Sequence, residues 1–162
     1  MTRSALLTKA PGIATITNEG AAGKANQDAY LYLRVGPGQA EAWEAQPGQS
    51  LYIVGVADGV TGQAAGDYAS AIAVKTISKV LRQQNNGLPN AQRLNDAIHA
   101  ANQTILQATV QNPDQRGMST TIVVAIVDQW QLYLAHLGDS RAYLIRNKVA
   151  HQLSLDHTWV QE

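Results

Sequence analysis

The fold is decided by the stretch from Leu51 to Gly62, which reads LYIVGVADGVTG. Its apolar first part predicts a strand over 51–57, which runs directly into Asp58 and a glycine-containing turn. A rigid strand fixes where the Asp58 carboxylate points, while Gly59 lets the backbone turn sharply and leaves its carbonyl open to an ion. Taken alone, an Asp-Gly sequence is typical of an ordinary turn as well as of a cation ligand.

Two further acids occupy comparable positions at predicted strand ends. Asp28 stands at the start of a strand-like run, and Asp139 lies in the turn Gly138-Asp139-Ser140 after another strand. Carboxylates on strand ends supply, on a stiff frame, the anionic oxygen ligands that a hard divalent cation prefers. By itself, Asp139 also fits a hairpin turn in which Asp and Ser bond to backbone groups and Arg141 makes a surface ion pair.

The apolar patterns along the chain predict blocks of strands separated by helices. Strands are predicted over residues 13–17, 30–35, 51–57, 120–127, 130–137, 141–146 and 149–153. Helices are predicted over about 63–84 and 91–111, where apolar residues recur on one face. Strands, then two consecutive helices, then hairpinned strands indicate an α+β fold with antiparallel sheet rather than a βαβ pattern.

Composition narrows the classes of function. The chain has 162 residues, enough for a real core, and we expect 1–162 to form a single domain. Its formal net charge is +0 and it contains no block of basic residues, which argues against a nucleic-acid partner or a membrane-surface role. The absence of cysteine excludes disulfides, zinc thiolate sites and thiol nucleophiles.

Signals for membrane insertion and export are missing from the sequence. The longest aliphatic run, 122–127, is far too short to span a bilayer. Residues 1–9 lack the extended apolar segment of a signal peptide. We therefore expect no membrane partner and a cytoplasmic location.

Five motifs that carry acids, hydroxyls or glycines follow one another in a fixed order. They are Asn26-Gln27-Asp28, Asp58-Gly59-Val60-Thr61-Gly62, Gly117-Met118-Ser119-Thr120-Thr121, Gly138-Asp139-Ser140-Arg141 and Leu155-Asp156-His157-Thr158. This order resembles the metal-dependent protein phosphatase family (protein phosphatase type 2C, PPM) in its compact bacterial form. The resemblance extends from Ile13 onward. An unrelated structural α+β domain would explain the apolar periodicities but not these ordered motifs.

The resemblance implies a fold and a chemistry. The family fold is an αββα sandwich of antiparallel sheets with helix pairs, of which this chain would carry roughly the N-terminal two-thirds and one helix pair. The implied reaction is hydrolysis of phosphoserine and phosphothreonine on a protein substrate by a water that Mn²⁺ or Mg²⁺ activates. No protein nucleophile is then needed, in agreement with a chain that has no cysteine.

The resemblance also assigns metal ligands residue by residue. Asp58 would bridge two ions, Asp28 would help to hold the first, and the Gly59 carbonyl would complete the shell of the second. Asp139 matches the position that contributes to a third, weaker ion. The hydroxyls of Thr120 and Ser140 have no histidine at a telling spacing, so we interpret them as structural. We likewise interpret His136 and His157 as packing or hydrogen-bonding residues.

Two departures from the family pattern bear on activity. The family's phosphate-gripping arginine is replaced by Gly23, with Lys24 beside it, and lysine binds phosphate as a point charge without the bidentate fork. The family's flap, second Asp-Gly turn, second helix pair and Asp-Asn motif have no counterpart after Glu162. These departures leave open an alternative function, a catalytically impaired phosphatase-like fragment that acts as a binding or regulatory module.

The same departure predicts an apolar sheet face without a cover. Three explanations stay open: an N-terminal piece of a longer phosphatase, a shortened relative that buries this face against a second copy of itself, or a binding module. We expect self-association through the uncovered face.

Overall fold

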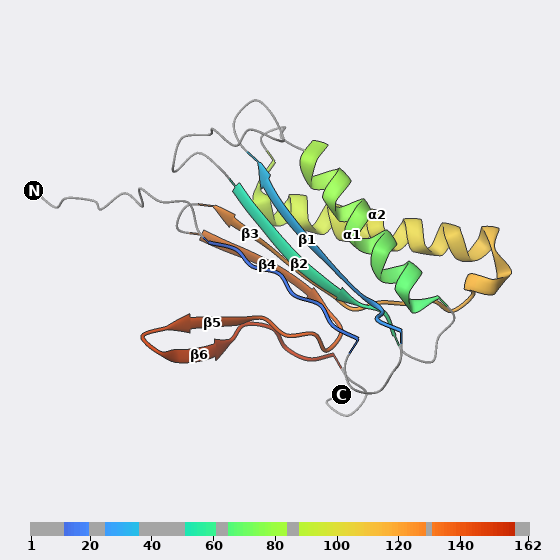
Figure 1. Cartoon of the computed structure of the whole chain (residues 1–162). Helices are drawn as coiled ribbons and strands as arrows, with labels where there is room; N and C mark the ends of the chain where they lie inside the picture. The colour runs from blue at the N-terminus through green and yellow to red at the C-terminus, as the bar shows by residue number, and fades with distance from the viewer. Residues whose placement is uncertain are drawn as a thin grey trace, which may run out of the picture.

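The computed structural model describes residues 12–19, 25–35, 51–60, 65–83, 88–128 and 131–157. Figure 1 shows the elements in chain order: β1 (Asp28–Val35), β2 (Leu51–Asp58), α1 (Gly66–Gln83), α2 (Asn90–Gln111), the short 3-10 helix η1 (Pro113–Gln115), β3 (Ile122–Asp128), β4 (Gln131–Leu137), β5 (Tyr143–Arg146) and β6 (Val149–Gln152). This is the predicted α+β order with one helix pair. Neither helix of the described residues is long and apolar enough to cross a membrane.

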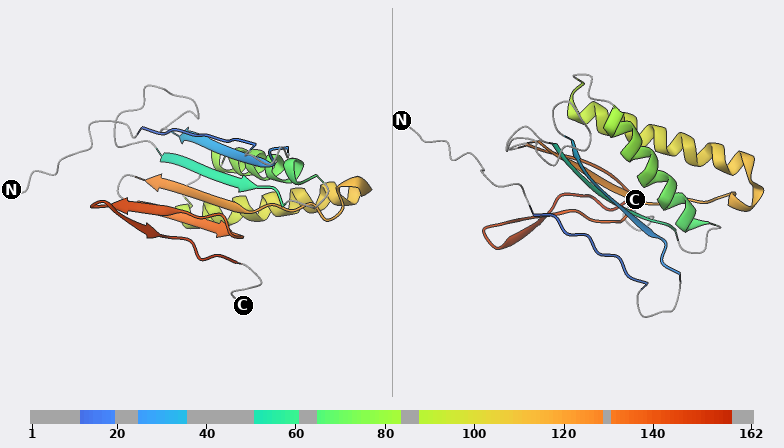
Figure 2. Two further views of the ribbon diagram at one scale, coloured as in Figure 1. Left: turned by 60° about the horizontal axis from the view of Figure 1, so that its bottom comes forward. Right: turned by 45° about the horizontal axis from the view of Figure 1, so that its top comes forward.

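The strands form an antiparallel sheet and a separate hairpin. The sheet has the order β1-β2-β3-β4, and β5 pairs with β6. Both helices pack on the same face of the sheet, and the hairpin lies on the side away from them (Figure 2). Because a strand's side chains alternate between faces, each strand sends one set toward the helices and the other set toward the hairpin.

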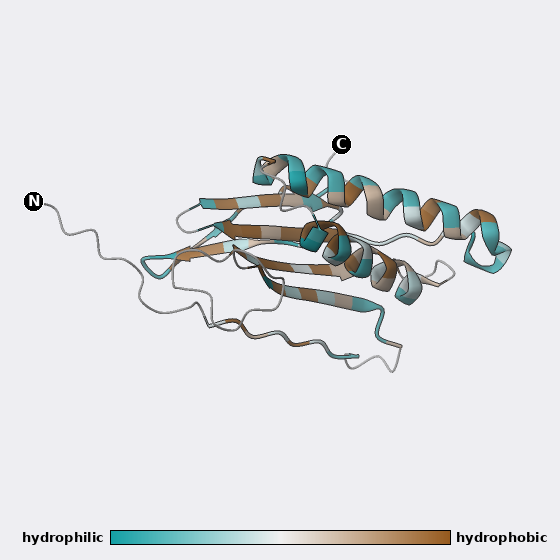
Figure 3. Ribbon diagram, turned by 90° about the horizontal axis from the view of Figure 1, so that it is seen from above, coloured by the Kyte–Doolittle hydropathy of each residue, from teal (hydrophilic) through white to brown (hydrophobic). Residues whose placement is uncertain are grey.

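The core lies between the helices and the sheet. In α1 the buried residues Ala69, Ala73, Ile77 and Leu81 recur every four residues and so form one stripe. They meet a sheet surface that includes the fully buried side chains Ile53, Val124 and Ile126. Hydrophobic colour accordingly runs along the central strands in Figure 3. The apolar residues that predicted this helix are therefore the residues that it buries.

One buried charge in this layer was not predicted. Arg93 on α2 is only 3% exposed. Its Nη2 donates to the Leu81 carbonyl at 3.0 Å and its Nη1 donates to Asn90 Oδ1 at 2.9 Å. The guanidinium thus satisfies a carbonyl in the last turn of α1, where helices leave such groups without intrahelical partners.

The other face of the sheet carries exposed apolar side chains, as expected. Tyr30, Val56 and Leu132 are each between 45% and 47% exposed. Together with residues 12–16 and the base of the hairpin they line a groove of about 620 Å³. The described chain therefore leaves this apolar face open to solvent.

The predicted strand over 13–17 is wrong. Residues 12–19 form no strand, although residues 12–16 line the groove on the open face of the sheet and the segment lies toward its β1 edge (Figure 2). Their alternating pattern favours an extended chain, but a strand also needs a partner edge for its backbone groups. Ile16, an apolar residue of the pattern, is 94% exposed.

The last hairpin is shorter than predicted. β5 begins at Tyr143 rather than at Arg141, and β6 ends at Gln152. Residues just before and after the hairpin instead bond in other ways: the Ala142 carbonyl accepts from the Leu153 N–H at 2.8 Å, and the Ala142 N–H donates to Ser154 Oγ at 3.0 Å.

Candidate metal centre

Strand register brings two of the predicted ligands together. β1 and β2 are antiparallel, and Asp28, the first residue of β1, lies directly opposite Asp58, the last residue of β2. Directly opposed residues point to the same face, with their Cβ atoms about 4.5–5.5 Å apart. Two carboxylates from distant parts of the sequence therefore share one end of the sheet.

The electrostatics of Asp58 reflect this crowding of negative charge. Burial raises the pKa of Asp58, and the charge of Asp28, a side-chain hydrogen bond with Asp28 and the charge of Asp139 raise it further. Nothing in the described surroundings of Asp58 lowers its pKa. The site consequently favours a proton, or another cation, between the two carboxylates.

The turn after Asp58 requires glycine. The Gly59 N–H donates to the Gln27 carbonyl at 3.1 Å, which ties this turn to the residue before Asp28. A Cβ on Gly59 would overlap the backbone of Gly66, the first residue of α1. Ser70 Oγ in α1 also donates to the Gln27 carbonyl, at 2.6 Å. The start of α1 therefore packs directly against the strand ends that carry the acids.

The residues leading into β3 hold the backbone of Asp58 from the other side. The Asp58 N–H donates to Thr121 Oγ1 at 3.0 Å. The Asp58 carbonyl accepts from the Thr121 N–H at 2.8 Å and from Thr120 Oγ1 at 2.9 Å. Both backbone polar groups of Asp58 are thus bonded to two adjacent threonines of the Gly-Met-Ser-Thr-Thr motif.

Asp139 lies in a loop next to this pair but does not complete a cluster with it. Within the parts of the chain that the structure describes, no three acidic or histidine side chains lie close enough to hold one ion together. Asp139 still acts on Asp58 through its charge. Its neighbour Ser140 makes a hydrogen bond of 2.7 Å between its Oγ and Thr121 Oγ1.

The loop that carries Asp139 is shaped by tight packing. Gly138 has a φ of +100°, and a Cβ there would lie 2.8 Å from Thr121 Cγ2. The Gly138 carbonyl accepts from the His157 N–H at 2.8 Å. The Leu-Asp-His-Thr motif therefore touches the Gly-Asp-Ser-Arg motif through the backbone.

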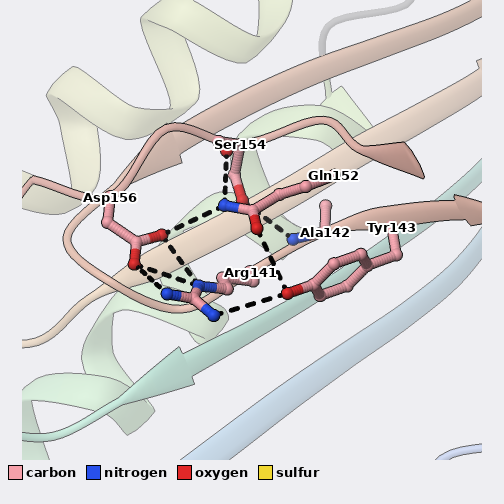
Figure 4. Close-up of polar contacts among 6 residues, drawn as sticks. All are labelled: Arg141, Ala142, Tyr143, Gln152, Ser154 and Asp156. Carbon is pink, nitrogen blue, oxygen red and sulfur yellow. Dashed lines mark hydrogen bonds and ion pairs between the residues drawn. The ribbon is translucent and has the colours of Figure 1, made fainter. Parts of the chain in front are cut away.

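A second link joins the same two motifs through side chains (Figure 4). Arg141 Nε donates to both carboxylate oxygens of Asp156 at 3.0 Å, and Nη2 also donates to Asp156. Gln152 Nε2 adds a hydrogen bond of 3.3 Å to Asp156 Oδ1. The guanidinium of Arg141 lowers the pKa of Asp156 below its ordinary value. Arg141 thus makes an ion pair, as in the alternative interpretation of this turn, and its partner is Asp156, whose side chain is only 8% exposed.

A pocket of about 230 Å³ opens beside the acids. Asp28, Asp58 and Ser140 line it together with Thr17, Tyr30 and other residues of the open sheet face. The pocket is large enough for a phosphoryl group and a few waters, and its carboxylates would repel a phosphate dianion unless a cation intervened.

Comparison with known sequences settles the family. The family Protein phosphatase 2C matches residues 35–162. The chain belongs to the protein phosphatase 2C family. The serine/threonine phosphatase stp of Listeria monocytogenes is 40% identical over 114 residues, which make up 68% of this chain and 45% of that protein. The chain therefore spans less than half the length of this protein phosphatase 2C relative.

Solved structures agree with this assignment. The serine/threonine phosphatase Stp1 from Staphylococcus aureus matches with a TM-score of 0.73 and 25% identity, over 90% of this chain and 53% of that one. The catalytic domain of the serine threonine protein phosphatase PstP, in complex with 2 manganese ions, matches with a TM-score of 0.70 and 27% identity, over 89% and 55% of the two chains. The α+β fold with antiparallel sheets is thus the protein phosphatase 2C fold.

Four other residues of the predicted motifs or site lie outside the Asp28–Asp58 pair, and their outcomes differ. Lys24, predicted to bind the substrate phosphate, lies outside the described residues. The rings of His136 and His157 pack together with centroids 5.0 Å apart. Thr121 was part of a predicted motif but had no predicted role. Its hydrogen bond joins it to a residue 63 positions earlier, and the sequence around Thr121 gives no sign of that contact.

Proposed function

We propose that this chain carries part of the metal centre of a protein serine/threonine phosphatase that hydrolyses phosphomonoesters. The observation that carries the proposal is the pairing of Asp28 with Asp58, where burial and the charge of Asp28 raise the pKa of Asp58. The names of its family relatives as serine/threonine phosphatases support this reaction and a phosphorylated protein as substrate. A cytoplasmic location belongs to the same proposal.

The donor set suits a small, hard divalent cation. The available ligands are the carboxylates of Asp28 and Asp58 and the backbone carbonyl of Gly59, all of them oxygen atoms. Mg²⁺ and similar ions take one or two carboxylates and keep several waters, so a third side-chain ligand is not required. We propose Mn²⁺ or Mg²⁺ as the cofactor, held by Asp28, Asp58 and Gly59, with Asp139 contributing to a weaker additional ion.

Different residues of the chain would position the metal ligands and bind the substrate phosphate. Bound ions would supply a nucleophilic water and neutralise the charge of the phosphoryl oxygens. Asp58, fixed through both of its backbone polar groups, holds its carboxylate at a set position beside the pocket. Lys24 attracts the substrate phosphate as a point charge in this proposal.

The test is hydrolysis of p-nitrophenyl phosphate and of a phosphothreonine peptide by this chain in millimolar Mn²⁺. We expect turnover that disappears on chelation and in Asp58→Asn and Asp28→Asn. Asp114→Asn in η1, which removes an exposed acid elsewhere, serves as the matched control and should retain activity. Turnover that survives in both Asp58→Asn and Asp28→Asn would contradict the proposed role of the pair.

The open apolar face favours a second candidate, in which this chain is a binding or regulatory module, and separately favours self-association of the chain through the same face. Tyr30, Val56 and Leu132 on that face remain about half exposed in the described chain. We expect sedimentation to show association that increases with protein concentration. Monomeric behaviour over a wide concentration range, with full Mn²⁺-dependent turnover, would eliminate this candidate.

A further inference from the structure

Asp58 is bonded to its surroundings in an unusual way for a residue at a strand end. Its N–H donates to a side chain, Thr121 Oγ1, at 3.0 Å rather than to a backbone carbonyl. Thr121 is only 9% exposed, so water competes poorly for its hydroxyl. The Thr121 hydroxyl is therefore the partner of the Asp58 N–H, while the Asp58 carbonyl is bonded separately to the Thr121 N–H and to Thr120 Oγ1.

The same hydroxyl reaches the loop that carries Asp139. Thr121 Oγ1 and Ser140 Oγ lie 2.7 Å apart, and either hydroxyl can donate to the other. Ser140 directly follows Asp139 in sequence. A continuous path of two hydrogen bonds thus runs from the Asp58 backbone to the residue beside Asp139.

Neighbouring contacts hold each end of this path in place. Gly138 packs so closely on Thr121 that a Cβ would come within 2.8 Å of its Cγ2. Arg141, which directly follows Ser140, is fixed to Asp156 by hydrogen bonds from both Nε and Nη2. The Thr121 and Ser140 hydroxyls therefore have little freedom to choose other partners.

We propose that Thr121 and Ser140 are positioning residues that hold Asp58, and with it the Asp28–Asp58 pair, in the geometry that binds a divalent cation. The proposal rests on the proposed metal centre. Hydrogen bonds outside the ligand set orient ligands, and their loss typically costs about 10–100-fold in metal affinity or activity. Thr121 acts through Asp58, to which it is hydrogen-bonded, and is not itself among the proposed ligands.

The variants separate the hydroxyl from the volume of the side chain. Thr121→Val removes the hydroxyl at nearly constant shape, whereas Thr121→Ser keeps it. Ser140→Ala removes only the hydrogen bond between Ser140 and Thr121. Thr104→Val on α2 is the control for the loss of a threonine hydroxyl, because Thr104 Oγ1 donates to the backbone carbonyl of Ala100, far from the acids in sequence. Circular dichroism confirms that each variant is folded.

Two readouts are taken on the full 162-residue chain. The first is amide hydrogen exchange of Asp58 without metal, measured by NMR, and the second is Mn²⁺ affinity, measured by calorimetry. We expect Thr121→Val to speed exchange at Asp58 and to weaken Mn²⁺ binding by about 10-fold or more. Thr121→Ser should restore both values, Ser140→Ala should weaken Mn²⁺ binding, and Thr104→Val should change neither readout.

The outcomes distinguish this inference from the proposed function. Mn²⁺ affinity within about twofold of wild type in both Thr121→Val and Ser140→Ala would overturn the positioning role while leaving the metal centre intact. Mn²⁺ binding without any phosphatase turnover would overturn the proposed function alone, and the affinities would still decide the role of Thr121. A wild-type chain that binds no Mn²⁺ would overturn both.

Discussion

Replacing Asp58 by asparagine should stabilise the metal-free protein at neutral pH. Burial and the charge of Asp28 raise the pKa of Asp58 above its ordinary value. The unfolded chain therefore releases this proton at a lower pH than the folded chain does, and folding loses stability as the pH rises through the folded pKa. The asparagine side chain carries no charge, so the Asp58→Asn variant escapes that loss.

The size of the effect follows from the strand register. Asp28 and Asp58 are directly opposed, so their charges lie roughly 5 Å apart. Coulomb's law then gives a repulsion of about 0.8 kcal/mol in bulk water and about 3 kcal/mol at the effective dielectric constant of a protein surface. Asp28 and Asp58 both keep much of their surface in water, and Asp58 is only partly shielded from it, which favours the lower end; we expect Asp58→Asn to gain about 1 kcal/mol. For a protein of this size, that raises the melting temperature by about 2–4 °C.

The assay is thermal unfolding in EDTA at pH 7 and at a pH below the ordinary pKa of aspartate. The gain should be present at pH 7 and absent at the acidic pH, where Asp58 is protonated in both folded and unfolded chains. Asp114→Asn, in η1, controls for the loss of one exposed negative charge outside the pair. Asp58→Asn that is equal to or less stable than wild type at pH 7 would refute the reasoning.

Mn²⁺ should reverse this order of stabilities. A ligand that binds only the folded state stabilises it by about 2.7 kcal/mol at a concentration 100 times its dissociation constant. The wild-type protein should gain this stability on addition of Mn²⁺, and Asp58→Asn should not. Asp58 would then destabilise the folded protein without metal and be required for its stabilisation by Mn²⁺.

Three further predictions concern backbone and packing, and urea unfolding measures all of them. Gly59→Ala places a Cβ against the backbone of Gly66 and should cost about 1–3 kcal/mol or more; an unchanged midpoint would contradict the packing of α1 on this turn. Gly138→Ala, at a φ of +100°, should cost about 1–3 kcal/mol. Arg93→Ala should cost about 1–3 kcal/mol, because the Leu81 carbonyl loses its donor; wild-type stability would show that water replaces it.

The helices and most strands were predictable because burial itself is periodic. Ala69, Ala73, Ile77 and Leu81 share a stripe in the sequence for the same reason that they share a core. The strand predicted over 13–17 failed because alternation describes two faces of a chain, whereas a strand depends on a partner elsewhere in the sequence. The role of Arg93 was not predicted, since no local pattern indicates that its guanidinium meets the end of another helix.

The candidate site was predictable in its composition but not in its geometry. The glycine turn after Asp58 and the order of the motifs pointed to these acids, and register then placed Asp28 opposite Asp58. The structure adds that Asp139 forms no three-ligand cluster with them in the described chain. The hydroxyl path from Thr121 to Ser140 has no sequence signal, because it depends on contacts across 63 and 19 positions of the chain.

The most direct test of the account is a Mn²⁺ titration of the 162-residue chain followed by electron paramagnetic resonance of the free ion. We expect wild type and Asp114→Asn to remove Mn²⁺ from solution with the same affinity, and Asp28→Asn and Asp58→Asn each to lose this binding. Binding by both aspartate variants that equals that of wild type would contradict a metal centre at the Asp28–Asp58 pair.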